Sequence, residues 1–245
     1  MSDFLTGARL TTSYDFNDGN GRMDGWYFSP NTVHPMADGT VQLNGEGAWG
    51  SSSMSLREPL SSGQAVVIDF KASSGLMELF LDKGSFGASD YLRPLGIHIQ
   101  ADGRVTANIF EGASFLQPSF SGNLQRLDPA RTYAMLMAVS PEGAVRMGIW
   151  DKDDPSLWLQ YEASYPPLAG KNLTLAAGVH TGVMNVDNVD ILSYTSLSPL
   201  PEAPTPIPVR QATPIPVQPT SVGPGVTATE QPKPVSGFAL EGNQY

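Results

Sequence analysis

Residues 132–151, TYAMLMAVSPEGAVRMGIWD, decide the fold class of this chain. Two short apolar runs, 133–139 and 144–150, lie on either side of the turn sequence Pro-Glu-Gly at 141–143. Apolar runs of strand length that flank a turn with Pro and Gly predict an antiparallel hairpin. This part of the chain is therefore expected to form neighbouring strands of one sheet.

The same pattern recurs along most of the chain. A second hairpin, GIHIQADGRVTANIF at 96–110, is expected to turn at Asp102 and Gly103. Further strand-like runs, separated by clusters of Gly, Asp, Ser and Pro, include TSYDF, TVQLN, QAVVIDFKA, LMELFLD, NLTLAAG and VMNVDNVDILSY. Many short strands joined by tight turns are typical of a sandwich and not of alternating strands and helices. The sequence therefore predicts an all-β, two-sheet antiparallel jelly-roll sandwich over residues 11–195.

The ends of the chain have a different composition. Residues 1–10 are expected to form an N-terminal extension. Residues 196–236 are rich in Pro and Thr and contain the unit TPIPV at 205–209 and again at 213–217. Because proline has no N–H to donate and this stretch can bury little apolar area, it is expected to be an extended linker. Residues 237–245 are expected to begin a following segment that is truncated or absent from this chain.

The composition excludes several classes of function. The net charge is −10 and the basic residues are not clustered, so we do not expect nucleic acid as a partner. The absence of cysteine excludes a disulfide framework, thiol catalysis and Cys-ligated metal. No basic start with an apolar run marks a signal peptide in this chain, and no stretch approaches the ~20 apolar residues of a membrane span. We expect an extracellular or cell-surface protein, present here as its mature form or as a piece of it.

Strand alternation indicates a candidate binding surface. Successive side chains of a strand point to opposite faces, so the apolar residues of 77–82, 97–99, 105–109 and 145–149 form the core side. If these strands share one sheet, its other face carries Glu78, Phe80, Asp82, His98, Gln100, Asn108, Phe110, Arg146 and Trp150. Aromatic rings stack on the apolar faces of sugars while polar groups bind the hydroxyls, which favours a carbohydrate site. The alternative is an ordinary solvated sheet face with a few aromatic residues.

Three stretches resemble a known family. They are SYDFNDGNGRMDGW at 13–26, RTYAMLMAVSPEGAVRMGIWDKDDPS at 131–156 and GVMNVDNVDILSY at 182–194. Together they resemble the laminin-G-like jelly rolls of the concanavalin A-like lectin and glucanase superfamily. The resemblance implies the same sandwich over residues 11–195. It implies sugar binding, adhesion or glycoside hydrolysis as activities, among which the fold alone does not choose.

The resemblance implies a specific pattern of acidic residues for a hydrolase. Glucanases of this fold carry their acids as Glu-x-Asp-x-Glu on one strand, where a retaining mechanism needs a nucleophile and a general acid. The nearest match here is ELFLD at 78–82, which has Phe80 in place of the middle acid and Asp82 in place of the last one. We therefore expect no enzymatic activity.

A structural metal ion is implied by the same resemblance. Jelly-roll modules of this type often hold Ca²⁺ where the first and last strands join, and Asp15 and Asp18 open the domain while Asp187 closes it. Calcium prefers carboxylate, amide and carbonyl oxygens. The apolar phase slips between Val183 and Val189, which predicts a β-bulge near Asp187. The alternative is that these acids serve only as turn formers.

These observations predict a non-catalytic carbohydrate-binding module that the Pro-rich linker tethers to a neighbour. Its partner would be a polysaccharide or another glycan. A second hypothesis makes the protein a subunit of a surface fibre, in which residues 199–245 contact another copy of the chain. A glycoside hydrolase with atypical acids is the third and least favoured hypothesis.

Overall fold

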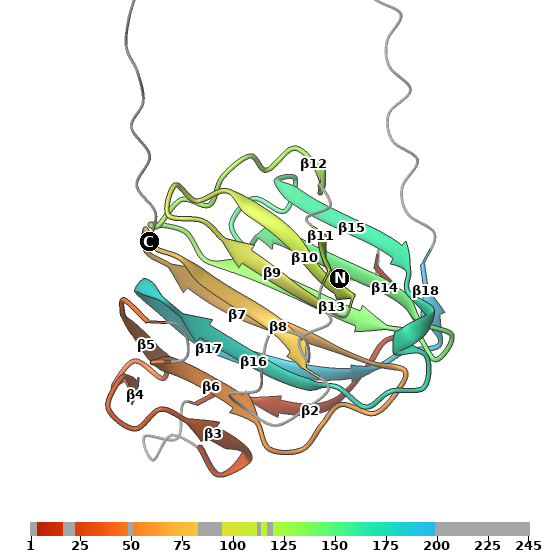
Figure 1. Cartoon of the computed structure of the whole chain (residues 1–245), viewed down its shortest axis with the longest axis horizontal. Helices are drawn as coiled ribbons and strands as arrows, with labels where there is room; N and C mark the ends of the chain where they lie inside the picture. Colours follow the sequence, from red (N-terminus) through yellow and green to blue (C-terminus); the bar gives the residue numbers. More distant parts are fainter. Residues whose placement is uncertain are drawn as a thin grey trace, which may run out of the picture. The chain divides into compact units, whose positions relative to one another are not determined.

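The computed structural model describes residues 4–16, 23–48, 51–82, 95–111, 114–116 and 120–198 (Figure 1). The chain divides into two units, Met1–Pro201 and Glu202–Tyr245, and every described residue belongs to the first. The TPIPV repeats and the expected following segment, 237–245, therefore lie outside the described residues. No described helix has the length and apolar character that crossing a membrane requires.

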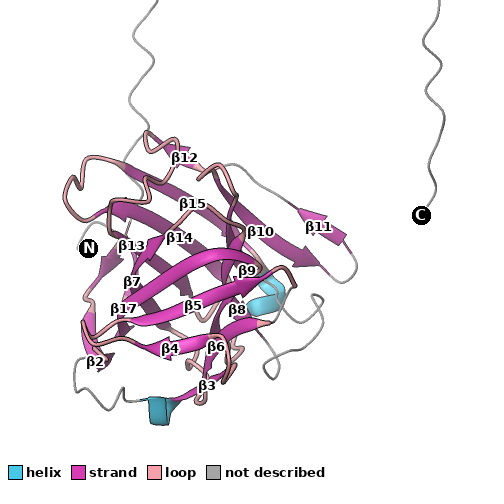
Figure 2. Ribbon diagram, turned by 90° about the vertical axis from the view of Figure 1, so that its left-hand side faces the viewer, coloured by secondary structure: helices cyan, strands magenta, loops and turns pink. Residues whose placement is uncertain are grey.

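Two antiparallel sheets make up most of the described domain (Figure 2). A pair of short terminal strands completes it. The seven-stranded front sheet has the order β11 (Ser114–Leu116), β10 (Val105–Glu111), β9 (Leu95–Ile99), β8 (Met77–Asp82), β16 (Thr174–Val179), β6 (Ser52–Leu56) and β3 (Trp26–Phe28). The nine-stranded back sheet has the order β12 (Ser121–Gly122), β15 (Trp158–Ser164), β14 (Ala144–Asp151), β13 (Tyr133–Val139), β7 (Gln64–Ala72), β17 (Thr181–Ser193), β5 (Val41–Glu46) and β4 (Val33–Pro35), with β2 (Arg9–Tyr14) also paired to β17. β1 (Leu5–Thr6) pairs only with β18 (Ser196–Leu197) among these strands. Short 3-10 turns at Met23–Gly25 and Pro166–Leu168 complete the described elements, and the predicted all-β antiparallel sandwich is confirmed.

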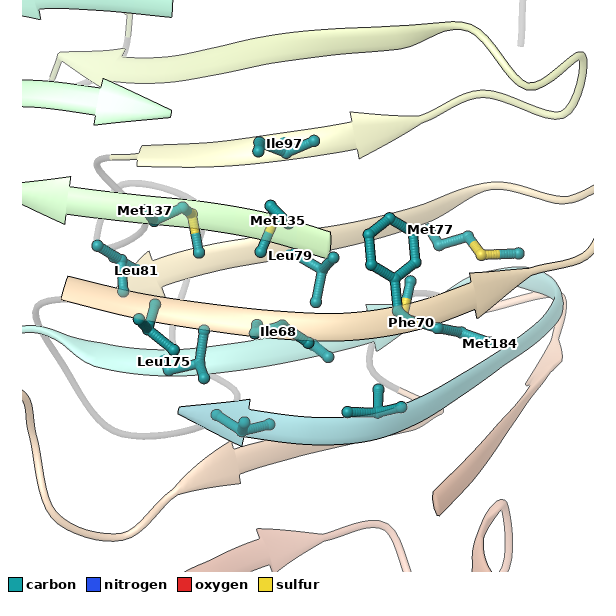
Figure 3. Close-up of a cluster of buried hydrophobic side chains, with 14 of the residues drawn as sticks. Ile68, Phe70, Met77, Leu79, Leu81, Ile97, Met135, Met137, Leu175 and Met184 are labelled. Carbon is teal, nitrogen blue, oxygen red and sulfur yellow. The ribbon is translucent and has the colours of Figure 1, made fainter. Parts of the chain in front are cut away.

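The main core lies between the two sheets (Figure 3). The front sheet contributes Met77, Leu79 and Ile97, and the back sheet contributes Ile68 and Met135, all of them buried. Burying a side chain of this size stabilises the fold by about 1.5–3 kcal/mol. The alternation predicted for 77–82, 97–99 and 145–149 is confirmed, since their odd-numbered apolar residues all belong to this core.

Both predicted hairpins are present. β13 and β14 are joined by a turn in which Gly143 has φ +87° and the N–H of Ser140 donates to the Ala144 carbonyl at 2.7 Å. β9 and β10 are joined by a turn in which Gly103 has φ +79°. Both glycines occupy the left-handed region that side chains disfavour, which explains why each turn ends in Gly.

The ends of the domain differ from the sequence-based expectation. Residues 1–10 were expected to be an extension, but Leu5 is buried on the back sheet and β2 pairs with β17. Ser196 and Leu197 were expected to belong to the linker, but they pair with β1. The described domain therefore begins before residue 11 and continues past residue 195, because its terminal strands close over an apolar patch.

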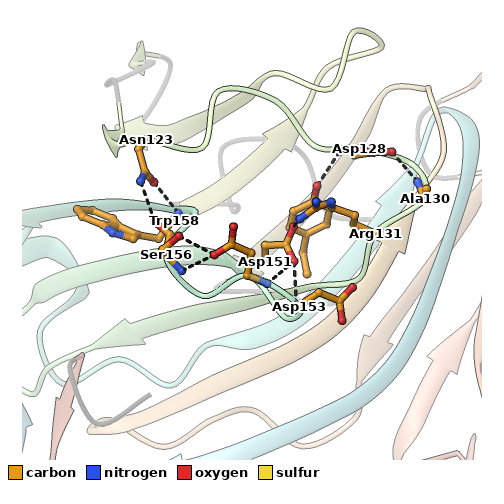
Figure 4. Close-up of polar contacts among 10 residues, drawn as sticks. Asn123, Asp128, Ala130, Arg131, Asp151, Asp153, Ser156 and Trp158 are labelled. Atoms are coloured by element: carbon orange, nitrogen blue, oxygen red, sulfur yellow. Dashed lines mark hydrogen bonds and ion pairs between the residues drawn. The ribbon is translucent and has the colours of Figure 1, made fainter.

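Polar contacts order the turn that follows β14 (Figure 4). Asp151 has a fully buried side chain, and its carboxylate accepts from Arg131 Nη1 at 2.6 Å and from the N–H groups of Asp153 and Asp154 at 2.8 and 3.0 Å. Burial acts to raise the pKa of Asp151, but the hydrogen bonds from Arg131 and from these N–H groups hold the pKa below its usual value. The acidic run DKDDPS at 151–156 is thus a structured turn, as its composition predicts.

Candidate functional site

The candidate site lies on the front face, which we define as the surface of the front sheet that points away from the core. Neighbouring strands place directly paired residues side by side on this face. One such row, the acid row, crosses β6, β16, β8, β9 and β10 and consists of Ser53, Gly178, Glu78, His98 and Thr106. The sheet register therefore aligns hydroxyl, carboxylate and imidazole groups across five strands.

Glu78 and His98 form the central contact of the acid row. Nε2 of His98 lies 2.8 Å from Oε2 of Glu78. The Glu78 side chain is 7% exposed and that of His98 is 16% exposed, so the pair is largely shielded from water. Gly178 leaves room beside the carboxylate, since a Cβ there would meet Glu78 Oε1 at 3.5 Å, an ordinary contact. The pair offers a fixed hydrogen-bond acceptor next to an imidazole. Glu78 and His98 each make further interactions besides this contact.

A second row, the aromatic row, runs parallel to the first. It consists of Tyr27, Ser55, Ala176, Phe80, Gly96 and Asn108. Phe80 and Asn108 are buried, at 5% and 0% exposure, although neither belongs to the main core. The ring of Phe80 is therefore not open to solvent, in contrast to a simple exposed stacking platform.

The front face also holds two buried hydroxyl groups that have no hydrogen-bond partner among the described residues. Ser55 Oγ and Thr106 Oγ1 are buried and accept or donate no hydrogen bond within the described part of the chain. A buried polar group that makes no hydrogen bond destabilises the fold by about 1–3 kcal/mol. A bound water or polar ligand that completes the hydrogen bonds of such groups is one explanation for their presence. Ser55 on β6 and Thr106 on β10 lie on either side of the Glu78–His98 pair of β8 and β9, which marks this face as a candidate binding site.

The structure divides the predicted sugar-binding residues between two sheets. Glu78, Phe80, His98 and Asn108 share the front face, but Arg146 and Trp150 lie on β14 of the back sheet. The expectation that these strands share one sheet is therefore wrong for β14. Strand alternation gives the face of each side chain but not the sheet to which the strand belongs.

Arg146 and Trp150 instead hold the N-terminal strand on the back sheet. Arg146 is 1% exposed, its Nε donates to Glu162 at 3.0 Å, and its Nη1 donates to the carbonyl of Phe4. The rings of Phe4 and Trp150 stack, with centroids 5.5 Å apart and planes at 20°. Leu5 then covers an apolar patch that includes Val67 and Leu136. These side chains therefore stabilise the fold on the face opposite the candidate site.

The remaining members of the predicted set lie near the site. Asp82 pairs in register with Thr174 at the end of β8, and its side chain is outside the description, as is that of Phe110. Gln100 directly follows β9 and is half-buried, and its N–H donates to the carbonyl of Arg104 at 2.8 Å in the β9–β10 turn.

The predicted metal ligands are only partly described. Asp15 follows β2 and is exposed, Asp187 is half-buried on β17, and Asp18 lies outside the described residues. The predicted β-bulge is present, because the register of β17 with β7 shifts between Val186 and Val189. Burial first, and then nearby carboxylates that include Asp69 and Asp15, raise the pKa of Asp187. The described residues bring together no group of three acidic or histidine side chains that fits a metal ion.

Two residues that the sequence reasoning missed lie at the end of the aromatic row. Tyr27 on the edge strand β3 is 53% exposed, and the guanidinium carbon of Arg57 lies 4.9 Å from the centroid of its ring. The signal that could have found them is the alternation in SSMSLR at 52–57, which puts Ser53, Ser55 and Arg57 on one face. This stretch is rich in Ser, so it lacks the β-branched composition of a typical strand.

A separate cavity of about 140 Å³ lies between the end of β7 and the β9–β10 turn. Its lining is mostly apolar and includes Ala72, Ile99 and Leu127. The acidic group at its edge, Asp102, is already paired with Arg104 at 2.7 Å. None of the residues predicted for sugar binding lines this cavity, so the front face remains the better candidate site.

No family model and no curated protein matches this sequence. Solved structures with a similar fold include the exoplasmic/lumenal domain of VIP36 in its Ca²⁺/Man3GlcNAc-bound form, at TM-score 0.57 and 11% identity over 76% of this chain and 91% of that chain. The carbohydrate recognition domain of Emp46p in its potassium-bound form matches at TM-score 0.58 and 13% identity over 77% and 100%. A legume lectin-like domain from Entamoeba histolytica matches at TM-score 0.55 and 11% identity over 75% and 97%. At these identities the likeness concerns the fold, and the described domain of this chain has the concanavalin A-like fold.

Proposed function

We propose that this protein is a non-catalytic carbohydrate-binding module and that its front face binds the sugar. The observation that carries the proposal is the acid row, in which Glu78 and His98 are hydrogen-bonded at 2.8 Å in line with the hydroxyl residues Ser53 and Thr106 of other strands. Rigid strands hold these groups, so they are pre-organised for a ligand. The lectin domains with the same fold are consistent with this proposal.

The chemistry of the face matches that of sugar hydroxyls. A hydroxyl both donates and accepts, and the face offers a carboxylate acceptor, an imidazole, and the amide of Asn108. Ser55 Oγ and Thr106 Oγ1 can complete their hydrogen bonds with a ligand. Because these groups are shielded from water, a sugar that satisfies them gains more than it would on an open surface. A ligand without hydroxyls would leave them unpaired and bind poorly.

The same residues support binding without hydrolysis. Glycosidases of the usual kind need two carboxyl groups that flank the scissile bond. The described side chains of the front face provide the carboxylate of Glu78, which is already engaged with His98. The proposed role of this pair is therefore to orient and bind hydroxyls.

Further parts of the proposal concern the surroundings of the domain. We propose an extracellular or cell-surface location for the protein. We also propose that the residues beyond 198 act as a tether, because their Pro/Thr-rich composition favours an extended chain. We further propose a structural Ca²⁺ held by Asp15, Asp18 and Asp187. Because the described residues form no group of three ligands for a metal ion, this proposal requires Asp18 as the third ligand. Assembly of a fibre through residues 199–245 is the alternative outcome, and the mass of the full chain in solution distinguishes it from a tether.

Affinity electrophoresis in gels that contain soluble polysaccharides tests the sugar-binding proposal. The wild type should be retarded by at least one glycan, and His98→Ala and Glu78→Gln should lose most of that retardation. His34→Ala is the matched control, because His34 is exposed on β4 of the back sheet. Thermal unfolding of each variant verifies the fold. Equal retardation of all four proteins, or none in any gel, would overturn the proposal.

A further inference from the structure

The exposed end of the aromatic row carries a cation. Tyr27 lies on the edge strand β3, opposite Ser55 in register, and therefore points to the front face. Arg57 follows β6 and lies over the Tyr27 ring with 4.9 Å between guanidinium carbon and ring centroid. Its Nε donates to the carbonyl of Trp26 at 2.9 Å, which fixes the plane of the guanidinium. The pair is thus positioned, and both residues are accessible.

Arg57 has no carboxylate partner within the described part of the chain. Arg104, Arg131 and Arg146 each lie against an acidic side chain, whereas Arg57 forms no ion pair there. The adjacent Glu58 acts instead on Tyr14, whose pKa is raised by burial and by that carboxylate. The terminal amino groups of Arg57 therefore remain available, in a protein with 24 acidic and 14 basic residues.

From this arrangement we propose that the ligand of the front face is an acidic glycan, whose anionic group binds Arg57 while a sugar ring packs beside Tyr27. A planar guanidinium offers parallel N–H groups that match the geometry of a carboxylate and also bind sulfate. The inference rests on the proposed function, because it names the class of sugar that the front face selects.

The negative charge of the Glu78 carboxylate does not prevent an anionic group from binding at Arg57. β3 and β8 are separated by two intervening strands, so their backbones are about 14 Å apart at the usual strand spacing. This separation exceeds the Debye length of about 8 Å at physiological ionic strength. An anionic group at Arg57 is therefore attracted locally and only weakly repelled by Glu78. The ligand that reaches both positions is longer than a single sugar ring.

Paired glycans with one backbone test the inference. Binding of the intact protein to polygalacturonate is compared with binding to its methyl-esterified form, and binding to a sulfated galactan with binding to the desulfated galactan. For at least one of the two pairs, the wild type should bind the anionic glycan about tenfold or more tightly than its neutral counterpart. This ratio is on the scale of a charge-assisted hydrogen bond. The preferred form, carboxylated or sulfated, identifies the source of the negative charge. Raised salt should weaken that preference.

Variants assign the preference to Arg57. Arg57→Gln should bind the anionic and neutral forms equally, and Arg57→Lys should keep part of the preference. Arg9→Gln is the control for net charge, because Arg9 is exposed on β2 of the back sheet. A wild type without preference, or an Arg57→Gln variant that keeps it, overturns the inference. If neutral glycans then still bind in a His98-dependent manner, the proposed function stands; if no glycan binds, both fail.

Discussion

The imidazole of His98 contacts the carboxylate of Glu78 across the β8–β9 pair, at 2.8 Å between Nε2 and Oε2. The contact lies on the front face, while Arg146 and Trp150, which share the same polar and aromatic character, lie on the back sheet. The polar and aromatic side chains of the two sheets therefore have different roles in this domain. The first set forms the proposed sugar site, and the second set attaches the N-terminal strand.

Arg146→Ala should reduce the free energy of unfolding by about 2–3 kcal/mol without affecting glycan binding. Arg146 is almost fully buried, and its loss leaves the Phe4 carbonyl and the Glu162 carboxylate without their donor. The cost is moderated because the Glu162 side chain is 35% exposed and can be hydrated. Urea unfolding measures the change, and Arg104→Ala, which removes an exposed ion pair and should cost much less, is the control. Equal costs for both variants would contradict the assignment.

Asp151 should make stability depend on pH in the acidic range. Its folded-state pKa is lowered, so its contribution is fully present above the unfolded pKa of about 3.9 and is lost as pH falls through the folded value. Asp151→Asn keeps an acceptor for the N–H groups of 153 and 154 but cannot ionise. The variant should be less stable than wild type near neutral pH, and the difference should shrink below about pH 4. Urea midpoints across this range measure it; a difference that stays constant with pH would argue against an ionised Asp151.

Replacing Gly103 in the β9–β10 turn by Ala should destabilise the fold more than the same replacement at Gly47, which also has a positive φ. A Cβ at Gly103 would lie 2.6 Å from the Leu127 carbonyl oxygen, whereas a Cβ at Gly47, with φ +89°, would meet nothing within 4 Å. Gly47→Ala should cost about 1 kcal/mol from backbone conformation alone. Gly103→Ala should cost more, because the Leu127 segment must also shift. Thermal unfolding of both variants compares them, and equal losses would remove the steric explanation.

Free Ca²⁺ should raise the melting temperature if Asp15, Asp18 and Asp187 hold a structural ion. A ligand that binds only the folded state stabilises it by about 2.7 kcal/mol at a hundredfold excess over its dissociation constant. Melting curves in chelator and in Ca²⁺ measure the effect, and Asp187→Asn should diminish it. Unchanged melting of the wild type between the two conditions would end the calcium proposal.

Local signals in the sequence were sufficient for much of the fold. The boundaries of β7 agree with the run QAVVIDFKA, and the turns at Gly103 and Gly143 follow from residues that tolerate positive φ. β6 and β15 were missed: their sequences, SSMSL and WLQYEAS, contain many polar residues, and neighbouring strands stabilise them.

The candidate site depended on information that is not local. Alternation correctly placed Glu78, His98 and Asn108 on one face, because side-chain direction repeats along each strand. It could not assign β14 to the other sheet, since strand order is set by long-range pairing. It also could not bring Tyr27 of β3 into the same row as Phe80, from which it is separated by more than fifty positions in the sequence.

Amide hydrogen exchange with and without a saturating glycan tests the central claim most directly. A sugar bound to the front face should slow exchange in β6, β8, β9 and β10 and leave β13 and β14 of the back sheet unchanged. The slowing should disappear in Glu78→Gln and remain in His34→Ala. Protection that appears on β13 and β14, or in no strand of the front sheet while the glycan is bound, would contradict the account.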